Sequence, residues 1–336
     1  MGKIITPKNY DSKLNLYETQ KAIKTIKDFF QVELSISLNL RRVTAPLFVN
    51  PETGLNDNLN NVERPVSFDI KDIKNIHGEV VQSLAKWKRY ALKKYDFNIH
   101  KGLYTDMNAI RRDEILDNIH SIYVDQWDRE KVIEEKDRNI EYLEKTVKEI
   151  YACLLKTEKF LALNYDFIGE HLPSNIYFIT SEELLKRYPE LSPKEREYAI
   201  VKEKKAVFIE KIGSKLSNGL PHDLRSPDYD DWELNGDLFV YYDVLDIPLE
   251  LSSMGIRVDA KSLKRQLELS NLTEREKLPF QKSILDNKLP FTIGGGIGQS
   301  RLCLFFLKKA HIGEVQCGLW DDETIEECKK NNIFLL

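Results

Sequence analysis

Apolar residues recur every three or four positions along several stretches of the chain, which is the spacing of one face of an α-helix. Residues 11–40 show this period with lysines between the apolar positions, and the charged stretch 129–162 predicts one or two amphipathic helices. Ser181 and Ser192 are each followed by acidic residues, which is typical of helix N-caps. The shorter candidate helices are Leu84–Lys94, Leu263–Leu269, Arg275–Leu285 and the apolar run Leu302–Leu307.

Alternation of side chains at a period of two predicts strands elsewhere. Residues 120–128 alternate in this way, and residues 236–246 and 249–259 form the strongest candidate for an antiparallel pair. The remaining candidate strands are Val43–Val49, Val62–Ile70, Glu79–Ser83, Ile176–Ile179 and Ala206–Ile209.

The order of these elements predicts the fold class. Strands occur in runs with long helices inserted, rather than in a regular alternation of strand and helix, so we expect an α+β fold with an antiparallel β-sheet flanked by helices. No repeat, low-complexity linker or charge block marks a second domain. We therefore expect residues 1–336 to form a single catalytic domain with helical insertions at roughly 129–205.

Composition argues against nucleic-acid and membrane partners and indicates a cellular compartment. The 50 basic and 54 acidic residues nearly balance, and the isoelectric point is near 6.0, so a dedicated nucleic-acid-binding surface is not expected. No window reaches the eighteen or so apolar residues of a membrane-spanning helix. The scattered cysteines fit reduced thiols, so we expect a cytoplasmic protein. They are Cys153, Cys303, Cys317 and Cys328.

The most informative stretch is Leu289–Arg301, which carries Gly294, Gly295, Gly296 and Gly298. Glycines let a backbone turn sharply and approach a ligand closely, so the segment predicts a strand, a glycine turn and a helix with an arginine in its first turn. Neither the dinucleotide-binding fingerprint nor the P-loop fits this spacing. The pattern resembles the third signature motif of class II aminoacyl-tRNA synthetases, in which the arginine lies against ATP.

A second candidate site lies in the segment 102–114, which ends in Arg-Arg-Asp-Glu before the strand predicted at His120. Taken alone, a solvated turn of mixed charge is the more common interpretation of such a segment. The functional interpretation is an arginine aimed at a phosphate, because a guanidinium fork matches phosphate oxygens. The segment resembles the second class II motif, with Arg111 as the candidate for the α-phosphate.

Two acidic residues are expected on paired strands. Alternation would place Glu250, Ser252, Met254 and Ile256 on one face of a strand unless the chain bulges near Gly255. The neighbouring strand carries Asp237, and two such carboxylates suit Mg²⁺, which prefers oxygen ligands. A pair of exposed acids at a sheet edge is an equally common outcome.

Several long segments occur together and in one order. They are Gln82–Arg89, Gly102–Thr105, His120–Asp128, Pro227–Trp232, Leu234–Asp237, Glu250–Asp259 and Gly294–Arg301. Between about Lys21 and Leu319 the chain resembles the ammonia-dependent asparagine synthetases of type A, the aspartate–ammonia ligases. This resemblance implies the catalytic fold of aspartyl- and asparaginyl-tRNA synthetases without an anticodon-binding domain, in a homodimer.

The resemblance also implies a reaction and its nucleotide site. L-aspartate, ATP and ammonia would give L-asparagine, AMP and pyrophosphate through a β-aspartyl-adenylate. Arg111 would stabilise the α-phosphate, and Arg301 would lie against adenine or a distal phosphate. Asp237 and Glu250 would hold Mg²⁺ on the triphosphate.

For the amino acid, Lys88 and Arg257 resemble the residues with which aspartyl-tRNA synthetases grip the aspartate side chain. Here that side chain must react, so they are expected to hold the α-carboxylate instead. Asp57, grouped with Asp230, would capture ammonium or take its proton. The residues expected to orient the amino acid are Ser83, Gln126, Asp128 and Ser253.

Free ammonia is the expected nitrogen source. Glutamine-dependent synthetases use an N-terminal cysteine nucleophile, whereas position 2 here is Gly and the first cysteine is Cys153. Two alternatives remain. One is a paralogue that transfers the activated acyl group to a tRNA or another amine, and the other is a non-catalytic nucleotide-binding module. The acidic balance argues against the first, and the intact set of candidate residues argues against the second.

Overall fold

A large twisted sheet forms the centre of the molecule in the computed structural model, which describes residues 4–57, 59 and 63–336. Its interior strands are antiparallel, whereas the edge strands β1 and β7 pair in parallel with β5 and β8. This confirms the α+β class. In sheet order the strands are β1 (Leu40–Arg42), β5 (Gly102–Ile110), β6 (Tyr123–Val132), β11 (Thr292–Gly298), β10 (Ile247–Arg257), β9 (Asp230–Tyr242), β8 (Ala206–Glu210) and β7 (Tyr177–Thr180).

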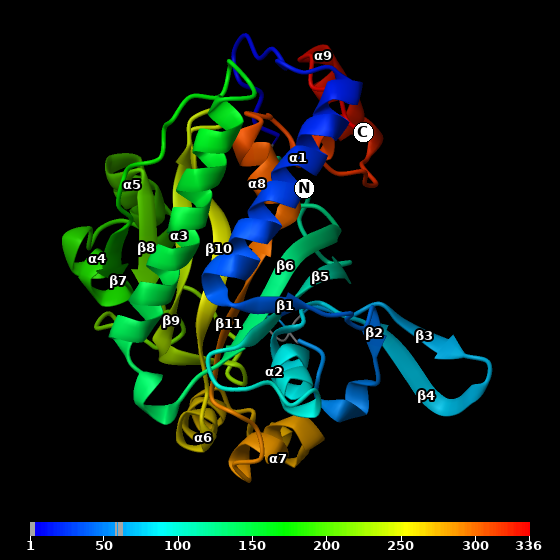
Figure 1. Ribbon diagram of the computed structural model, residues 1–336, viewed down its shortest axis with the longest axis vertical. Coiled ribbons are helices and arrows are strands. Elements are labelled where there is room, and N and C mark those ends of the chain that lie inside the picture. The colour runs from blue at the N-terminus through cyan, green and yellow to red at the C-terminus, as the bar shows by residue number, and fades with distance from the viewer. Residues whose placement is uncertain (1–3, 58, 60–62) are drawn as a thin grey trace.

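A small second sheet projects from the body of the molecule (Figure 1). It contains β2 (Phe48–Val49), β4 (Ile73–Val80) and β3 (Ser67–Ile70), in that order. The predictions Val43–Val49, Val62–Ile70 and Glu79–Ser83 therefore match strands only in part. Val62 lies outside the described residues.

Nine α-helices lie in the described part of the chain, most of them where apolar periodicity predicted them. No helix of residues 4–57, 59 or 63–336 has the length and apolar content needed to cross a bilayer. The helices are α1 (Leu16–Leu38), α2 (Ala85–Lys94), α3 (Ile140–Ala162), α4 (Ser181–Arg187), α5 (Pro193–Lys204), α6 (Ala260–Leu269), α7 (Pro279–Leu285), α8 (Gln299–Phe306) and α9 (Asp322–Lys330).

Local chemistry explains where several helices begin. Ser192 caps α5 as predicted, whereas the cap of α4 is Thr180 rather than Ser181. The helix expected over 275–285 is divided into a 3₁₀ helix, Thr273–Lys277, and α7, because Pro279 lacks a backbone N–H and suits a first helical turn. In the stretch 129–162, the first residues extend β6 instead, so α3 begins only after its cap, Asn139.

The two faces of the sheet carry different layers. Helices α1 and α3 lie side by side across one face (Figure 1), where Phe30 of α1 packs 5.0 Å from Trp127 of β6, measured between ring centroids. Strand alternation turns the neighbours of Trp127, Gln126 and Asp128, to the opposite face, where they line a cavity beside α2.

The glycine segment corrects one prediction. Gly294–Gly298 form a continuous strand paired with β6 and β10, and the helix α8 follows at once without a glycine turn. Close packing explains the glycines instead. A Cβ on Gly294 would lie 1.8 Å from Glu130 Oε2, and one on Gly296 would lie 2.3 Å from Gln126 Oε1. The absence of side chains here therefore gives neighbouring polar groups their space.

Candidate active site

One cavity of about 510 Å³ lies on the sheet face opposite α1 and α3. Its walls come from α2, from the connection between β5 and β6 and from β6 itself, from β10, β11 and α8, and from the segments before β3 and β9. The predicted site residues that line it are Asp57, Ser83, Lys88, Arg111, Gln126, Asp128, Asp230, Glu250, Ser253, Arg257 and Arg301. Residues remote in sequence thus meet in one hollow.

The inner wall of the cavity is built from buried ion pairs. Lys88 of α2 donates to Asp128 of β6 over 2.6 Å and to the carbonyl of Gly295 over 3.1 Å. The two side chains are only 1% and 4% exposed. Burial lowers the pKa of Lys88, and the charge of Asp128 opposes this effect. The pair therefore holds a rigid cation at the base of the cavity.

Arg257 extends this wall. Its Nε and Nη2 donate to Glu130 over 2.7–3.1 Å, and its Nη1 pairs with Asp230. Burial alone would raise the pKa of Glu130, but Arg257 holds it below the ordinary value. Burial raises the pKa of Asp230 in spite of the same arginine. Arg257 is thus fixed between two buried carboxylates, one on each side.

Asp57 occupies the side of the cavity next to α2. It is 2% exposed, and its Oδ2 accepts a hydrogen bond of 2.7 Å from the hydroxyl of Ser83. Burial and the charge of Asp57 raise the pKa of Tyr229, whose side chain also lines the cavity. A carboxylate in this position offers a desolvated negative group beside the space for a ligand.

The outer wall holds its arginines more loosely. Arg111 follows β5, and its guanidinium lies 3.4–3.5 Å from the carbonyl of Gln82. Arg301, in the first turn of α8 as predicted, donates over 3.1 Å to the carbonyl of Glu250, whose carboxylate lies 3.7 Å away. Both guanidinium groups keep N–H donors for a further ligand.

The predicted face of β10 is wrong in part. The register with β9 shifts between Glu250 and Ser252, which adds one residue to β10 and reverses the alternation. Glu250 consequently lines the cavity, whereas Met254 and Ile256 pack into the hydrophobic core. A second register shift, between Gly255 and Arg257, adds residues to β9 rather than β10, so regular alternation along β10 keeps Ser253 and Arg257 on the cavity face.

Asp237 is placed on the paired strand as expected, opposite Ser253. It does not line the cavity itself, because Arg225 covers it with hydrogen bonds of 2.7 and 2.8 Å. Desolvation and then the charge of Asp237 raise the pKa of Glu250, and the two residues lie on the paired strands β9 and β10. Their oxygen chemistry fits a hard divalent cation, provided that Arg225 shares Asp237 with it.

Comparison with known proteins identifies the family. The sequence pattern described as "Aspartate-ammonia ligase" matches residues 17–332. The chain belongs to the aspartate–ammonia ligase family. It is 59% identical over 336 residues to the aspartate–ammonia ligase of Clostridium perfringens strain SM101, with 100% of both chains covered. It is 57% identical over 327 residues to that of Fusobacterium nucleatum, covering 97% of this chain and 99% of the relative.

Solved structures show the same fold for this aspartate–ammonia ligase family member. The Pyrococcus horikoshii asparaginyl-tRNA synthetase in complex with asparaginyl-adenylate aligns with a TM-score of 0.65 at 13% identity, covering 90% of this chain and 70% of that chain. An Entamoeba histolytica aspartyl-tRNA synthetase aligns with a TM-score of 0.58 at 15% identity, covering 92% and 58%. These similarities confirm the class II synthetase-like architecture.

The sequence interpretation missed four residues of the site. Glu130 could have been found, because alternation along β6 places it on the same face as Asp128. Asp125 also lines the cavity and accepts hydrogen bonds from Lys27 and the backbone of Ser300. Arg225 and Tyr229 lie in the segment before β9, where no periodic pattern marks them.

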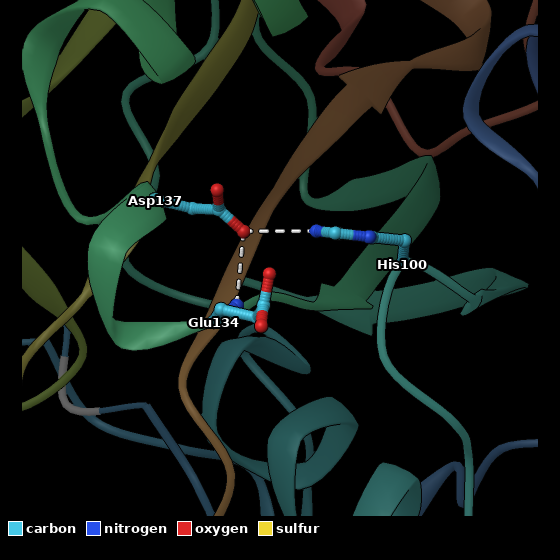
Figure 2. A group of neighbouring side chains, drawn as sticks. All are labelled: His100, Glu134 and Asp137. Atoms are coloured by element: carbon cyan, nitrogen blue, oxygen red, sulfur yellow. Dashed lines mark hydrogen bonds and ion pairs between the residues drawn. The ribbon is translucent and has the colours of Figure 1, made fainter.

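A group of side chains outside the cavity has the residue types of a metal site. Figure 2 shows His100 and Asp137 pointing toward each other beside Glu134, with His100 Nε2 2.9 Å from Asp137 Oδ2. The same oxygen caps the backbone N–H of Glu134, whose carboxylate pairs with Lys136. These contacts fasten the loop before β5 to the loop before α3, so we assign the group a structural role.

Proposed function

We propose that this chain catalyses the ATP-dependent amidation of L-aspartate with ammonia. The products are L-asparagine, AMP and pyrophosphate, and the intermediate is a β-aspartyl-adenylate. The observation that carries the proposal is the convergence of Lys88, Arg111, Arg257 and Arg301 on one cavity in a chain of this family. Four cations around a hollow of this size suit a nucleotide and a dicarboxylic amino acid together.

In the first step, an oxygen of the aspartate β-carboxylate attacks the α-phosphorus of ATP, and pyrophosphate leaves. Negative charge builds up on the phosphate oxygens, and Arg111 and Arg301 offer N–H donors that face the cavity to offset it. A Mg²⁺ ion held by Asp237 and Glu250 would supply further positive charge to the triphosphate.

The inner wall would orient the aspartate. Lys88 and Arg257 would hold its α-carboxylate, leaving the β-carboxylate free to react. Their buried partners fix both cations in advance, so that little conformational entropy is lost when the substrate binds. The residues that would bind the amino group and the remaining polar atoms are Ser83, Gln126, Asp128, Asp230 and Ser253.

In the second step, ammonia attacks the acyl carbon of the adenylate and AMP leaves. Ammonium must first lose a proton to become a nucleophile. Asp57 would capture the cation and take this proton, because it is a buried carboxylate at the cavity wall held in place by Ser83. Asp230, whose pKa burial raises, belongs to the same acidic region.

We also infer a homodimer, as the family resemblance implies. Helix α1 leaves several apolar side chains in solvent, with Tyr17 75% and Ile36 71% exposed, which a second copy could cover. Light scattering of the purified protein should give twice the mass of 39.2 kDa. A monomeric mass at micromolar concentration would contradict the inference.

The reaction itself tests the proposed function. The purified chain, given aspartate labelled with ¹⁸O in its β-carboxyl group, MgATP and ammonium, should form asparagine and AMP in equal amounts, with one labelled oxygen in the AMP. Label transfer distinguishes an acyl-adenylate from an acyl-phosphate. Formation of ADP, unlabelled AMP or no asparagine would refute the proposal, and asparagine formation from glutamine without ammonium would refute the nitrogen source.

A further inference from the structure

Arg225 is a cation of the active site that no sequence motif indicated. It lies in the segment between β8 and β9, and it lines the cavity. One terminal nitrogen donates to both oxygens of Asp237 over 2.7 and 2.8 Å, and the other donates to the hydroxyl of Ser253 over 2.6 Å. Its side chain is 11% exposed and that of Asp237 is 9% exposed. Arg225 thus bridges two residues that face each other across β9 and β10.

Arg225 lies among the charged residues that the proposed function assigns to the nucleotide and its metal ion. Arg225 bonds directly to Asp237, and Arg301 donates to the carbonyl of Glu250 and lies 3.7 Å from its carboxylate. Arg225 therefore contacts one of the two carboxylates that would hold the magnesium ion, and Arg301 contacts the residue that carries the other. These are the groups that would surround a triphosphate.

The hydrogen bonds of Arg225 are incomplete. A guanidinium has five N–H donors, and within the part of the chain that the structure describes its buried Nε has no hydrogen-bond partner. Arg257 differs, because its Nε is bonded to both oxygens of Glu130. An orphaned donor on a cation at a cavity wall favours an anionic ligand with several oxygens, since the fork of arginine matches phosphate geometry.

We propose that Arg225 binds the β- and γ-phosphates of ATP, the part that leaves as pyrophosphate, and that Asp237 holds its guanidinium in position before the nucleotide arrives. This rests on the proposed function, because it requires a nucleotide in the cavity. A divalent ion on Asp237 and Glu250 would share the carboxylate with Arg225, and the phosphate oxygens would take up its unpaired donors. The bound triphosphate would thereby be linked through Arg225 to the segment before β9.

Binding measurements on the full chain test this proposal. Calorimetry would compare ATP, pyrophosphate and AMP, each with and without Mg²⁺, for the wild type, Arg225→Gln and the control Arg187→Gln, an arginine that pairs with Glu203 on the surface. We expect Arg225→Gln to weaken ATP and pyrophosphate binding about tenfold or more and to leave AMP binding within about twofold. Arg187→Gln should match the wild type for all three ligands.

Other results would overturn the proposal. An equal loss for AMP would show that Arg225 only shapes the cavity. A loss seen only with Mg²⁺ would assign Arg225 to the arrangement of the metal-binding carboxylates. A wild-type chain that binds none of the ligands would instead refute the proposed function. If Arg225→Gln does not fold, Arg225→Lys can replace it, because lysine keeps a cation beside Asp237 but lacks the forked guanidinium. Unchanged pyrophosphate binding in Arg225→Lys would then overturn the proposed phosphate-binding role.

Discussion

The inner and outer walls of the cavity use the same residue types in different ways. On the inner wall, Lys88 and Arg257 are 1% and 2% exposed, and each is paired with a buried carboxylate. On the outer wall, Arg301 is 22% exposed, and the guanidinium of Arg111 lies 3.4–3.5 Å from a backbone carbonyl. Buried pairs fix a shape, whereas loosely bonded guanidinium groups keep donors for a ligand. The comparison indicates that the inner wall contributes to stability and substrate shape, and the outer wall to phosphate binding.

The largest expected effect concerns stability at the inner wall. Arg257→Ala would leave Glu130 and Asp230 buried without their cation, so we expect the free energy of unfolding to fall by about 3–5 kcal/mol. Denaturant titration followed by circular dichroism would measure it. Arg301→Ala, on the outer wall, should change the same quantity by less than about 1 kcal/mol. Equal losses for the two variants would remove the distinction between the walls.

The outer wall should show the opposite behaviour. Arg111→Ala is expected to lower turnover about 10²–10³-fold, because an N–H donor to a phosphate that gains charge in the transition state is lost, while stability changes by less than about 0.5 kcal/mol. Steady-state AMP formation would measure turnover. Its exposed neighbour gives a matched control, and Arg112→Ala should remain close to the wild type. Unchanged turnover in Arg111→Ala would exclude the phosphate role.

Glycines of β11 distinguish the walls more finely. Gly296→Ala would place a Cβ 2.3 Å from Gln126 Oε1 and 3.0 Å from Asp128 Oδ1. We therefore expect the KM for aspartate to rise about tenfold. The overpacking should also lower the free energy of unfolding by roughly 1–3 kcal/mol. The KM for ATP should change less. A Cβ at position 298 would lie 3.2 Å from Arg301 Cβ, so Gly298→Ala should change the KM for ATP more than the KM for aspartate. Initial-rate kinetics with each substrate varied would measure both KM values. A larger effect of Gly296→Ala on ATP, or of Gly298→Ala on aspartate, would contradict this assignment of the two glycines.

The smallest expected effect is a pH dependence at Glu250. Desolvation and the charge of Asp237 raise its pKa above the ordinary 4.5, so folding favours the protonated form and stability increases as the pH falls through the raised pKa. Mg²⁺ needs the carboxylate, so at this pKa the apparent Mg²⁺ affinity should fall about twofold. Nucleotide binding titrated with Mg²⁺ from pH 5 to 8 would measure it. Glu250→Gln should abolish this pH-dependent change in Mg²⁺ affinity. A change that persists in the variant would show that another group titrates.

The sequence predicted the broad fold because its strongest signals are local. The periodicity of residues 11–40 and the alternation of residues 236–259 depend on neighbours along the chain, and α1, β9 and β10 confirm both. The site was also largely predictable, since most of its residues lie in long segments that resemble the family. Eleven of the twelve proposed residues line one cavity, although their individual roles stay predictions.

Register and pairing were not predictable in the same way. One additional residue in β10 reversed the faces expected for Glu250 and Met254, and the glycines expected in a turn lie within β11. Both outcomes depend on which atoms of a neighbouring strand lie opposite, and a single sequence does not contain that information.

The linear sequence determined which segments are helices and strands and which charged residues are available for catalysis, because propensity and periodicity act over a few residues. Only the tertiary structure decided that Arg257 is held by Glu130 and Asp230 while Arg225 is held by Asp237. Electrostatic pairs act through space, and their partners are chosen by how the sheet and its connecting segments pack. Burial then sets the strength of each pair, since the same two charges interact far more strongly away from water.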